Sequence, residues 1–448
     1  MKEKKETAKT KKPKLQKKTA EAEPLHAKKK HTKEESKKTP PHEKPAKTST
    51  ALEKEPLQAE INIGMIGHVD AGKTSLVEAL TGQWVDTHSE ELKRGISIRI
   101  GYADTSFYHC QKCSLNFSIK NECPACGAKG SFLRKVSFVD APGHETLMTT
   151  MLSGAAMMNG AILVVAANEF CPQAQTIEHL NAMKIAGIKN IVVAQNKIDL
   201  VDKNRALESY KEIQKFLKEN NYEGSPVVPV AAHSKANISA LIEAIQQTMP
   251  SPVLDPLKPA KMYCGRSFDV NRPGTKPADL KGGVLGGTLL QGTIKKNEII
   301  EIAPGFNGKK IATKVFKINC ASGELETAKP GGLIAIETGI DPSLAQNDQL
   351  KGQVIGALGS LPEPISTLKL EIEFLKRQAV EAVPEIKTNE SIVLTIGTMT
   401  VMGTVIEAKP GSITVLLPRP VIAEKGQQVA ISKKEKMKWR LIAFGRME

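Results

Sequence analysis

One eight-residue segment constrains the fold more than any other feature of this chain of 448 residues. Residues 67–74 read G-H-V-D-A-G-K-T and fit the pattern G-x-x-x-x-G-K-[ST] of a phosphate-binding loop. The apolar run 61–66 precedes it and a helical pattern begins near Lys73, so the loop joins a strand to a helix. The sequence therefore predicts Lys73 at the β- and γ-phosphates of a nucleotide and Thr74 on Mg²⁺.

The base of the nucleotide is predicted from the tetrapeptide N-K-I-D at residues 196–199, which follows the apolar run 191–194. The carboxylate of Asp199 can accept hydrogen bonds from the N1–H and N2–H₂ groups of guanine, a donor pair that adenine lacks. The tetrapeptide alone is a weak signal. Its place at the end of a later strand, after a phosphate loop, favours GTP over ATP.

The segment D-A-P-G-H at residues 140–144 follows a further strand-like run, 137–139. Asp140 can hold Mg²⁺ through a water molecule, and the Gly143 N–H can contact the γ-phosphate. Hydrolysis would then release the residues that follow. His144 can orient the attacking water, the alternative being a surface histidine without a role.

The order of apolar runs predicts the architecture. Strand-like runs at 61–66, 137–139, 161–167, 191–194 and 227–231 alternate with helical patterns at 73–80, 175–186, 203–218 and 239–249. This alternation is typical of a parallel sheet covered on both faces. Beyond a proline cluster, short runs broken by glycine and proline indicate β-barrels or sandwiches. We predict a GTP-binding domain at 56–255 and two β domains at 256–362 and 363–448.

Residues 1–55 differ in composition from the rest of the chain. They contain 18 Lys, no Arg and 9 Glu, and so carry +9 of the formal net charge of +15. Such a segment cannot bury enough apolar surface to fold, and we expect a disordered tail. The tail is either simply solvated or a polycation that contacts RNA phosphates. With no apolar core of a secretory signal and no apolar run long enough to cross a bilayer, we expect a cytoplasmic protein without a membrane partner.

Four of the seven cysteines form the pattern C-x₂-C-x₉-C-x₂-C, namely Cys110, Cys113, Cys123 and Cys126. Two C-x₂-C turns present four thiolates tetrahedrally, which predicts a closed structural Zn²⁺ site in a knuckle at 108–130. A metal-free hairpin and a redox pair are the alternatives. Cys171, Cys264 and Cys320 lack metal spacing and are expected to be ordinary thiols.

These motifs together resemble a known family. The phosphate loop with D-x-P-G-H resembles translational GTPases, the group that contains elongation factor Tu. The stretch 88–98 and the cysteine insert, followed by 266–271, 280–283 and 328–332, resemble the gamma subunits of archaeal and eukaryotic translation initiation factor 2. The likeness covers roughly residues 58–448 and leaves the tail outside.

The resemblance implies an α/β P-loop GTPase domain with a zinc-knuckle insert, followed by two β-barrel domains. It implies a heterotrimer with alpha and beta subunits that carries methionylated initiator tRNA to the small ribosomal subunit. GTP hydrolysis would accompany start-codon selection, with GTP/GDP, Mg²⁺ and Zn²⁺ as cofactors. A selenocysteine carrier and a scaffold that keeps GTP as a structural cofactor are the alternatives.

The resemblance also implies site residues. For GTP they are Asp70, Ala71, Gly72, Lys73, Thr74, Ser75, Gly143, Asn196, Lys197, Asp199, Ala231, Ala232 and His233. For Mg²⁺ they are Asp70, Thr74, Gly95, Ser97 and, through water, Asp140. The catalytic set is His144 with the apolar gate of Val69 and Ile96. Residues near the tRNA acceptor end are Tyr102, Arg266, Phe268 and Lys281, with core packing as the alternative for the two rings.

The chain departs from the family pattern at four positions. Ala71 stands where His is usual, Ser97 where Thr is usual, and Ala231 where Ser is usual. Ser97 keeps the hydroxyl that would ligate Mg²⁺, and a backbone N–H at Ala231 can still reach guanine. Asn159 stands where Asp is usual, and the sequence suggests no role for it.

Overall fold

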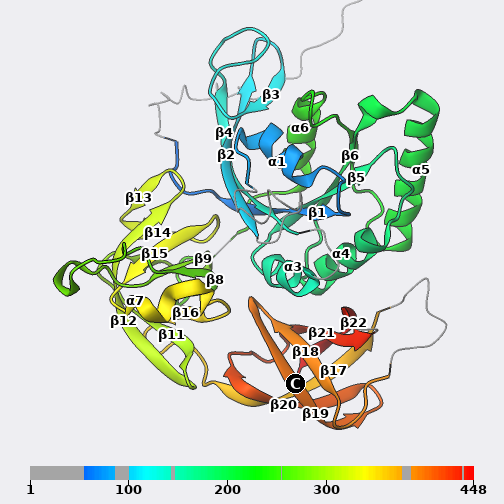
Figure 1. Ribbon diagram of the computed structural model, residues 1–448. Coiled ribbons are helices and arrows are strands. Elements are labelled where there is room, and N and C mark those ends of the chain that lie inside the picture. Colours follow the sequence, from blue (N-terminus) through cyan, green and yellow to red (C-terminus); the bar gives the residue numbers. More distant parts are fainter. Residues whose placement is uncertain (1–54, 86–99, 143–146, 254, 376–384, 436–437) are drawn as a thin grey trace, which may run out of the picture. The chain divides into compact units, whose positions relative to one another are not determined.

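A computed structural model describes residues 55–85, 100–142, 147–253, 255–375, 385–435 and 438–448 (Figure 1). The prediction of a disordered tail therefore falls outside the described residues, apart from Glu55. Among the described residues, no helix combines the length and the apolar composition needed to cross a membrane.

The first domain contains a seven-stranded sheet in the order β3-β2-β4-β1-β5-β6-β7. Its strands are β1 Ile61–Gly67, β2 Gly101–Cys110, β3 Leu115–Ser118, β4 Ser131–Asp140, β5 Gly160–Ala166, β6 Ile191–Asn196 and β7 Val227–Pro229. Strands β4, β1, β5, β6 and β7 run parallel, as predicted. Strand β2 is antiparallel to both neighbours, because the cysteine insert connects it directly to β4 as a hairpin.

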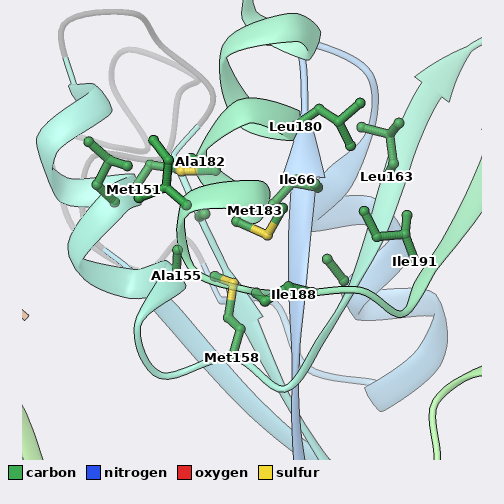
Figure 2. Close-up of a cluster of buried hydrophobic side chains, with 14 of the residues drawn as sticks. Ile66, Met151, Ala155, Met158, Leu163, Leu180, Ala182, Met183, Ile188 and Ile191 are labelled. Carbon is green, nitrogen blue, oxygen red and sulfur yellow. The ribbon is translucent and has the colours of Figure 1, made fainter. Parts of the chain in front are cut away.

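Helices cover both faces of this sheet. They are α1 Lys73–Thr81, α3 Met148–Ala155, α4 Ala174–Ile185, α5 Lys203–Glu219 and α6 Ile238–Thr248. Helices α3, α4 and α5 share one buried cluster with the strands, part of which Figure 2 shows around Met151, Leu180 and Met183. Helices α1 and α6 supply the cluster on the other face, with Leu76 and Ile245 among its members. Helix α3 was not predicted, because its eight residues make only about two turns, too few to show a clear helical period.

The second domain is a closed six-stranded barrel. Its strands are β8 Lys261–Phe268, β9 Val284–Gln291, β11 Ile299–Phe306, β12 Lys309–Cys320, β15 Ile334–Thr338 and β16 Val354–Ala357. They are hydrogen-bonded in the order β11-β16-β8-β9-β15-β12, and the pairing of β11 with β12 closes the ring. Short additions to this domain are β10 Ile294–Lys295, β13 Gly323–Leu325, β14 Thr327–Ala328, α7 Pro342–Ala345 and the 3₁₀ turns η3 Pro277–Asp279 and η4 Gln346–Asp348. A further 3₁₀ turn, η2 Ile198–Leu200, lies in the first domain.

The third domain is also a closed barrel, in the order β17-β20-β19-β18-β21-β22. Its strands are β17 Ile365–Phe374, β18 Ser391–Ile396, β19 Met399–Lys409, β20 Ser412–Val421, β21 Gln428–Glu435 and β22 Lys438–Met447. Alternate residues of β19 and β20 are buried and exposed, which is the pattern of a sheet with one face on a core. The predicted fold class is confirmed, whereas the domain limits stay a prediction.

Candidate functional site

The predicted phosphate loop connects the end of β1 to the start of α1 and depends on glycine. Gly72 precedes the helix with φ 91° and ψ 32°, a left-handed conformation that favours glycine. A Cβ at Gly72 would lie 2.3 Å from Nδ2 of Asn196, so there is no room for a side chain. Asp70 also has a left-handed conformation, with φ 60°, and its side chain is exposed at the loop.

Lys73 and Thr74 begin the helix with their polar ends directed at neighbouring groups. The Lys73 ammonium is buried and donates to the carbonyl oxygens of Gly67 at 3.2 Å and His68 at 2.8 Å. The Thr74 hydroxyl donates to Oδ2 of Asp140 at 2.7 Å. Two predicted Mg²⁺ ligands from different elements are thus adjacent, and both offer the oxygen atoms that Mg²⁺ prefers.

Asn196 joins the phosphate loop to the loop predicted to cover guanine. Its Nδ2 donates to the Ala71 carbonyl at 2.9 Å, and its Oδ1 accepts from the Ala232 N–H at 3.0 Å. Lys197 follows with φ 61°, and the Asp199 carboxylate is exposed in the 3₁₀ turn η2. The N-K-I-D segment therefore supplies a buried amide that links the two loops and an exposed carboxylate. Ala231 and Ala232 are buried and His233 is exposed in the adjoining loop, while Ser75 is half-buried in α1.

Two residues of α4 hold the phosphate loop and were missed by the sequence reasoning. The N–H of Gly67 donates to Nδ1 of His179 at 3.0 Å, and the N–H of Val69 donates to Oε1 of Gln175 at 3.1 Å. Burial, with Lys73 nearby, lowers the pKa of His179 to about 3. The imidazole is therefore neutral and can accept at Nδ1. Polar residues four apart on one face of a helix were the available signal.

Five predicted residues fall outside the described part of the chain: Gly95, Ile96, Ser97, Gly143 and His144. The roles of the switch segments and of the catalytic histidine therefore remain predictions. Val69, the other member of the predicted gate, is half-buried in the phosphate loop.

The four cysteines of the predicted knuckle lie together. Their Sγ atoms are all within 4.8 Å of one another, and those of Cys110 and Cys126 are 3.7 Å apart. Zn–S bonds of about 2.3 Å in a tetrahedron separate the sulfurs by about 3.8 Å, so the cluster has a suitable size for Zn²⁺. Gly127, with φ 69°, donates its N–H to the Cys123 carbonyl at 2.8 Å and closes the knuckle.

The remaining cysteines behave as packed thiols. Cys171 and Cys264 are buried, and burial raises the pKa of each to about 12. Cys320 is half-buried, and its thiol donates to the carbonyl oxygen of Leu57 at 3.3 Å.

Three of the four predicted acceptor-end residues line one cavity of about 220 Å³: Tyr102, Arg266 and Phe268. The Arg266 guanidinium carbon lies 4.9 Å from the centre of the Phe268 ring, and Nε donates to Asp348 at 2.9 Å. Tyr102 packs against the buried cluster of the first domain as well, and burial raises the pKa of its hydroxyl. Lys281 is not among the residues that line this cavity.

Comparison with known families matches both ends of the described chain. Residues 58–251 match the family model described as elongation factor Tu GTP binding domain. Residues 366–447 match the model described as initiation factor eIF2 gamma, C terminal.

Curated relatives are similar over most of the chain. The translation initiation factor 2 subunit gamma of Methanococcus aeolicus is 49% identical over 402 residues, which are 87% of this chain and 98% of that protein. The subunit gamma of Methanocaldococcus jannaschii is 48% identical, covering 89% of this chain and 100% of that protein.

Solved structures are similar in fold at lower identity. A bacterial selenocysteine-specific elongation factor has a TM-score of 0.68 at 24% identity, covering 86% of this chain and 58% of that one. The elongation factor SelB of Methanococcus maripaludis has a TM-score of 0.65 at 21% identity, covering 87% and 78%. At these identities the likeness concerns the fold alone.

The cysteine cluster predicts how zinc content responds to substitution. Cys126→Ser should lower bound zinc from one per chain to nearly none, because serine does not replace a thiolate in such a site. Elemental analysis of the purified full chain measures this. Cys320→Ser is the matched control and should keep its zinc, and equal zinc content in both variants would contradict the assignment.

The neutral imidazole predicts an acid sensitivity of the fold. Below the ordinary histidine pKa of about 6.5, the unfolded chain binds a proton that the folded chain takes up only near pH 3. The free energy of unfolding should therefore fall as the pH drops through this window, by up to about 1.4 kcal/mol per pH unit from this group. His179→Asn keeps an acceptor without titrating and should reduce the loss.

Calorimetric Tm values at neutral pH and near pH 5 give the measurement. The drop in Tm should be smaller for His179→Asn than for the wild type, with His109→Asn, at a half-buried site, as the control. Equal drops in the wild type and His179→Asn would show that the imidazole does not contribute.

Proposed function

Because the chain belongs to the family of gamma subunits of translation initiation factor 2, which are translational GTPases, we propose that it carries methionylated initiator tRNA to the small ribosomal subunit when GTP is bound. The family implies GTP and GDP as ligands with Mg²⁺, and a factor built from several subunits. We propose alpha and beta subunits as the companions in that complex. These partners put the proposed activity in the cytoplasm.

The cavity between the first domain and the first barrel carries this proposal. Tyr102 comes from the strand after the predicted first switch, whereas Arg266 and Phe268 come from β8. A guanidinium that lies 4.9 Å from the centre of an aromatic ring forms with it a surface to which an unpaired base can add. The terminal adenosine of an acceptor stem has both the exposed base and the charged backbone that such a surface binds.

The nucleotide site supports a GTP-dependent switch. Lys73 can exchange its two carbonyl acceptors for phosphate oxygens, while Gly72 lets the loop pack directly against the Asn196 amide. Thr74 and Asp140, with Asp70, Gly95 and Ser97, would hold Mg²⁺, which supplies charge neutralisation at the phosphates when bound. His144 would orient the attacking water behind Val69 and Ile96, and Gly143 would sense the γ-phosphate. We expect slow hydrolysis without a partner, because no arginine finger is evident in the sequence.

Zinc has a structural part in this proposal. The knuckle has only a small core of its own, with Tyr108 and Phe117 stacked at 5.5 Å between ring centres. Four thiolates closed around Zn²⁺ would stabilise such a small unit and leave no position open for a substrate.

Guanine selectivity is predicted to depend on Asp199. Asp199→Asn replaces an acceptor by a group that can donate, so affinity for GTP should fall by roughly tenfold or more. Affinity for xanthosine triphosphate, which carries an oxygen in place of the guanine amine, should rise. Competition against a fluorescent nucleotide measures both constants. The control is Asp202→Asn, three residues on, where the side chain caps α5 by accepting from the Arg205 N–H; unchanged preference in Asp199→Asn would contradict the base assignment.

Transport of initiator tRNA is tested by filter binding with the alpha subunit present. The wild type should bind methionylated initiator tRNA more tightly with GTP than with GDP. In the GTP state, Arg266→Ala should lower the affinity for this tRNA roughly tenfold, since stacking contributes about 1–3 kcal/mol per base. Arg272→Ala, at an exposed arginine outside the cavity, is the control.

Equal affinity in the two nucleotide states would count against the switch. Tighter binding of selenocysteinyl tRNA in competition would favour the other carrier. Failure to cleave GTP in a single turnover with ribosomal subunits would favour a scaffold.

A further inference from the structure

Asn62 of β1 has a buried carboxamide that reaches from the GTPase domain to the first barrel. The residue is 1% exposed. Its Nδ2 donates to the Met157 carbonyl and to the Thr288 hydroxyl, each at 2.9 Å, with the Gly332 carbonyl at 3.4 Å. One side-chain amide therefore contacts the turn after α3, strand β9 and the residue two before β15.

The backbone of Asn62 is held as firmly as its side chain. Its N–H donates to Oδ1 of Asn159 at 2.9 Å, and its carbonyl accepts from the Asn159 N–H at 2.8 Å. This reciprocal pair gives Asn159 a role that the sequence did not suggest. An aspartate at position 159 could accept the same hydrogen bond, which accounts for the exchange of Asp for Asn there.

The neighbouring contacts bring the two domains into backbone contact. Gly331 and Gly332 have φ values of 97° and 63°, and a Cβ at either would lie 2.5 or 2.7 Å from the carbonyl oxygen of Glu60 or Ala59. Gln58 adds a hydrogen bond from Nε2 to the Lys329 carbonyl at 2.6 Å. The paired glycines of the segment 328–332 are thus explained by this close approach.

The acceptors of the Asn62 amide adjoin the residues that line the cavity. Gly286 and Gly287 line it and directly precede Thr288, while Leu333 and Ile334 line it and directly follow Gly332. The two strands pair in register, with Ile334 opposite Gly287. The Thr288 hydroxyl donates to the Gly332 carbonyl at 2.8 Å and ties them together.

The opposite wall of the cavity adjoins the same amide. Met157, whose carbonyl accepts from Asn62, packs at Gly265 of β8, where a Cβ would lie 2.9 Å from its sulfur. The Tyr102 hydroxyl would be 3.4 Å from that Cβ. Met157 and the Tyr102 hydroxyl therefore lie at the same point of β8, and Asn62 holds the carbonyl of Met157.

We propose that Asn62 is a positioning residue for the acceptor end: its carboxamide sets the separation between the Tyr102 wall and the wall formed by β9 and β15. Binding of the acceptor end in this cavity rests on the proposed function, whereas the effect of Asn62 on the separation of the two walls does not. Asparagine suits the site because its amide donates to oxygens on both sides. An aliphatic side chain would leave the Met157 carbonyl unpaired, and a carboxylate would face oxygen acceptors.

The test compares variants of the full chain in two measurements. Asn62→Ala removes the amide, and Thr288→Val removes the hydroxyl without changing the shape of the side chain. Thr288→Ser and Asn159→Asp are the matched controls, because each keeps the atom that makes the hydrogen bond. Only variants whose Tm shows that they fold are compared. If Asn62→Ala does not fold, Thr288→Val alone tests the proposal.

Hydrogen exchange is the first measurement and needs no ligand. Asn62→Ala and Thr288→Val should lose protection in peptides covering 284–291 and 331–338, with the second barrel unchanged. Protection equal to wild type in both regions would overturn the proposal, as would loss spread evenly over all three domains.

Affinity is the second measurement. In the GTP state, both variants should bind methionylated initiator tRNA roughly tenfold more weakly, while their affinity for fluorescent GDP stays within about twofold. The double variant should lose less than the two single losses combined, because both remove one network. Unchanged tRNA affinity, or an equal loss of GDP affinity, would overturn the proposal. A wild type that binds no tRNA would contradict the proposed function instead, and the exchange result would still decide whether Asn62 holds the cavity strands.

Discussion

The nucleotide site depends on how closely the loop after β1 approaches the neighbouring strands. A Cβ at Gly67 would lie 2.3 Å from the Val164 carbonyl, and one at Gly72 would lie 2.3 Å from the Asn196 amide. Both residues have positive φ values, so the backbone itself forms the contact surface. The absence of a Cβ at both positions therefore lets the loop pack directly against β5 and the Asn196 side chain. The positions of Lys73 and Thr74 follow from this path of the backbone.

Three buried polar side chains extend this constraint to more distant elements. His179 accepts from the start of the loop, Asn196 braces it against the loop at Ala232, and Asn62 connects its strand to the first barrel. Each is at most 2% exposed and would destabilise the fold if left unpaired. Because each bond joins segments far apart in sequence, these side chains fix the positions of α4 and β9 relative to β1, and of the loop at Ala232 relative to β6.

The barrels and the knuckle are stabilised in different ways. The first barrel closes through the pairing of β11 with β12, and the second closes through six strands, so neither relies on an open sheet edge. The knuckle has only a few buried residues and depends on its four thiols instead. The knuckle extends from the GTPase sheet, and the two barrels follow that sheet in the chain. The knuckle provides the cysteine cluster, and the first barrel provides most of the cavity at Tyr102.

The sequence alone was sufficient for the features that depend on residues close together in the chain. These were the phosphate loop, the N-K-I-D segment, the cysteine spacing, the alternation of strands and helices, and the change to β domains beyond residue 260. It did not reveal α3, whose eight residues are too few to show a clear helical period. Nor did it reveal His179, Gln175 or Asn62, which read as ordinary helix and strand positions. Only the tertiary structure decided which polar side chains are paired, because these hydrogen bonds join residues from 36 to more than 200 positions apart in the chain.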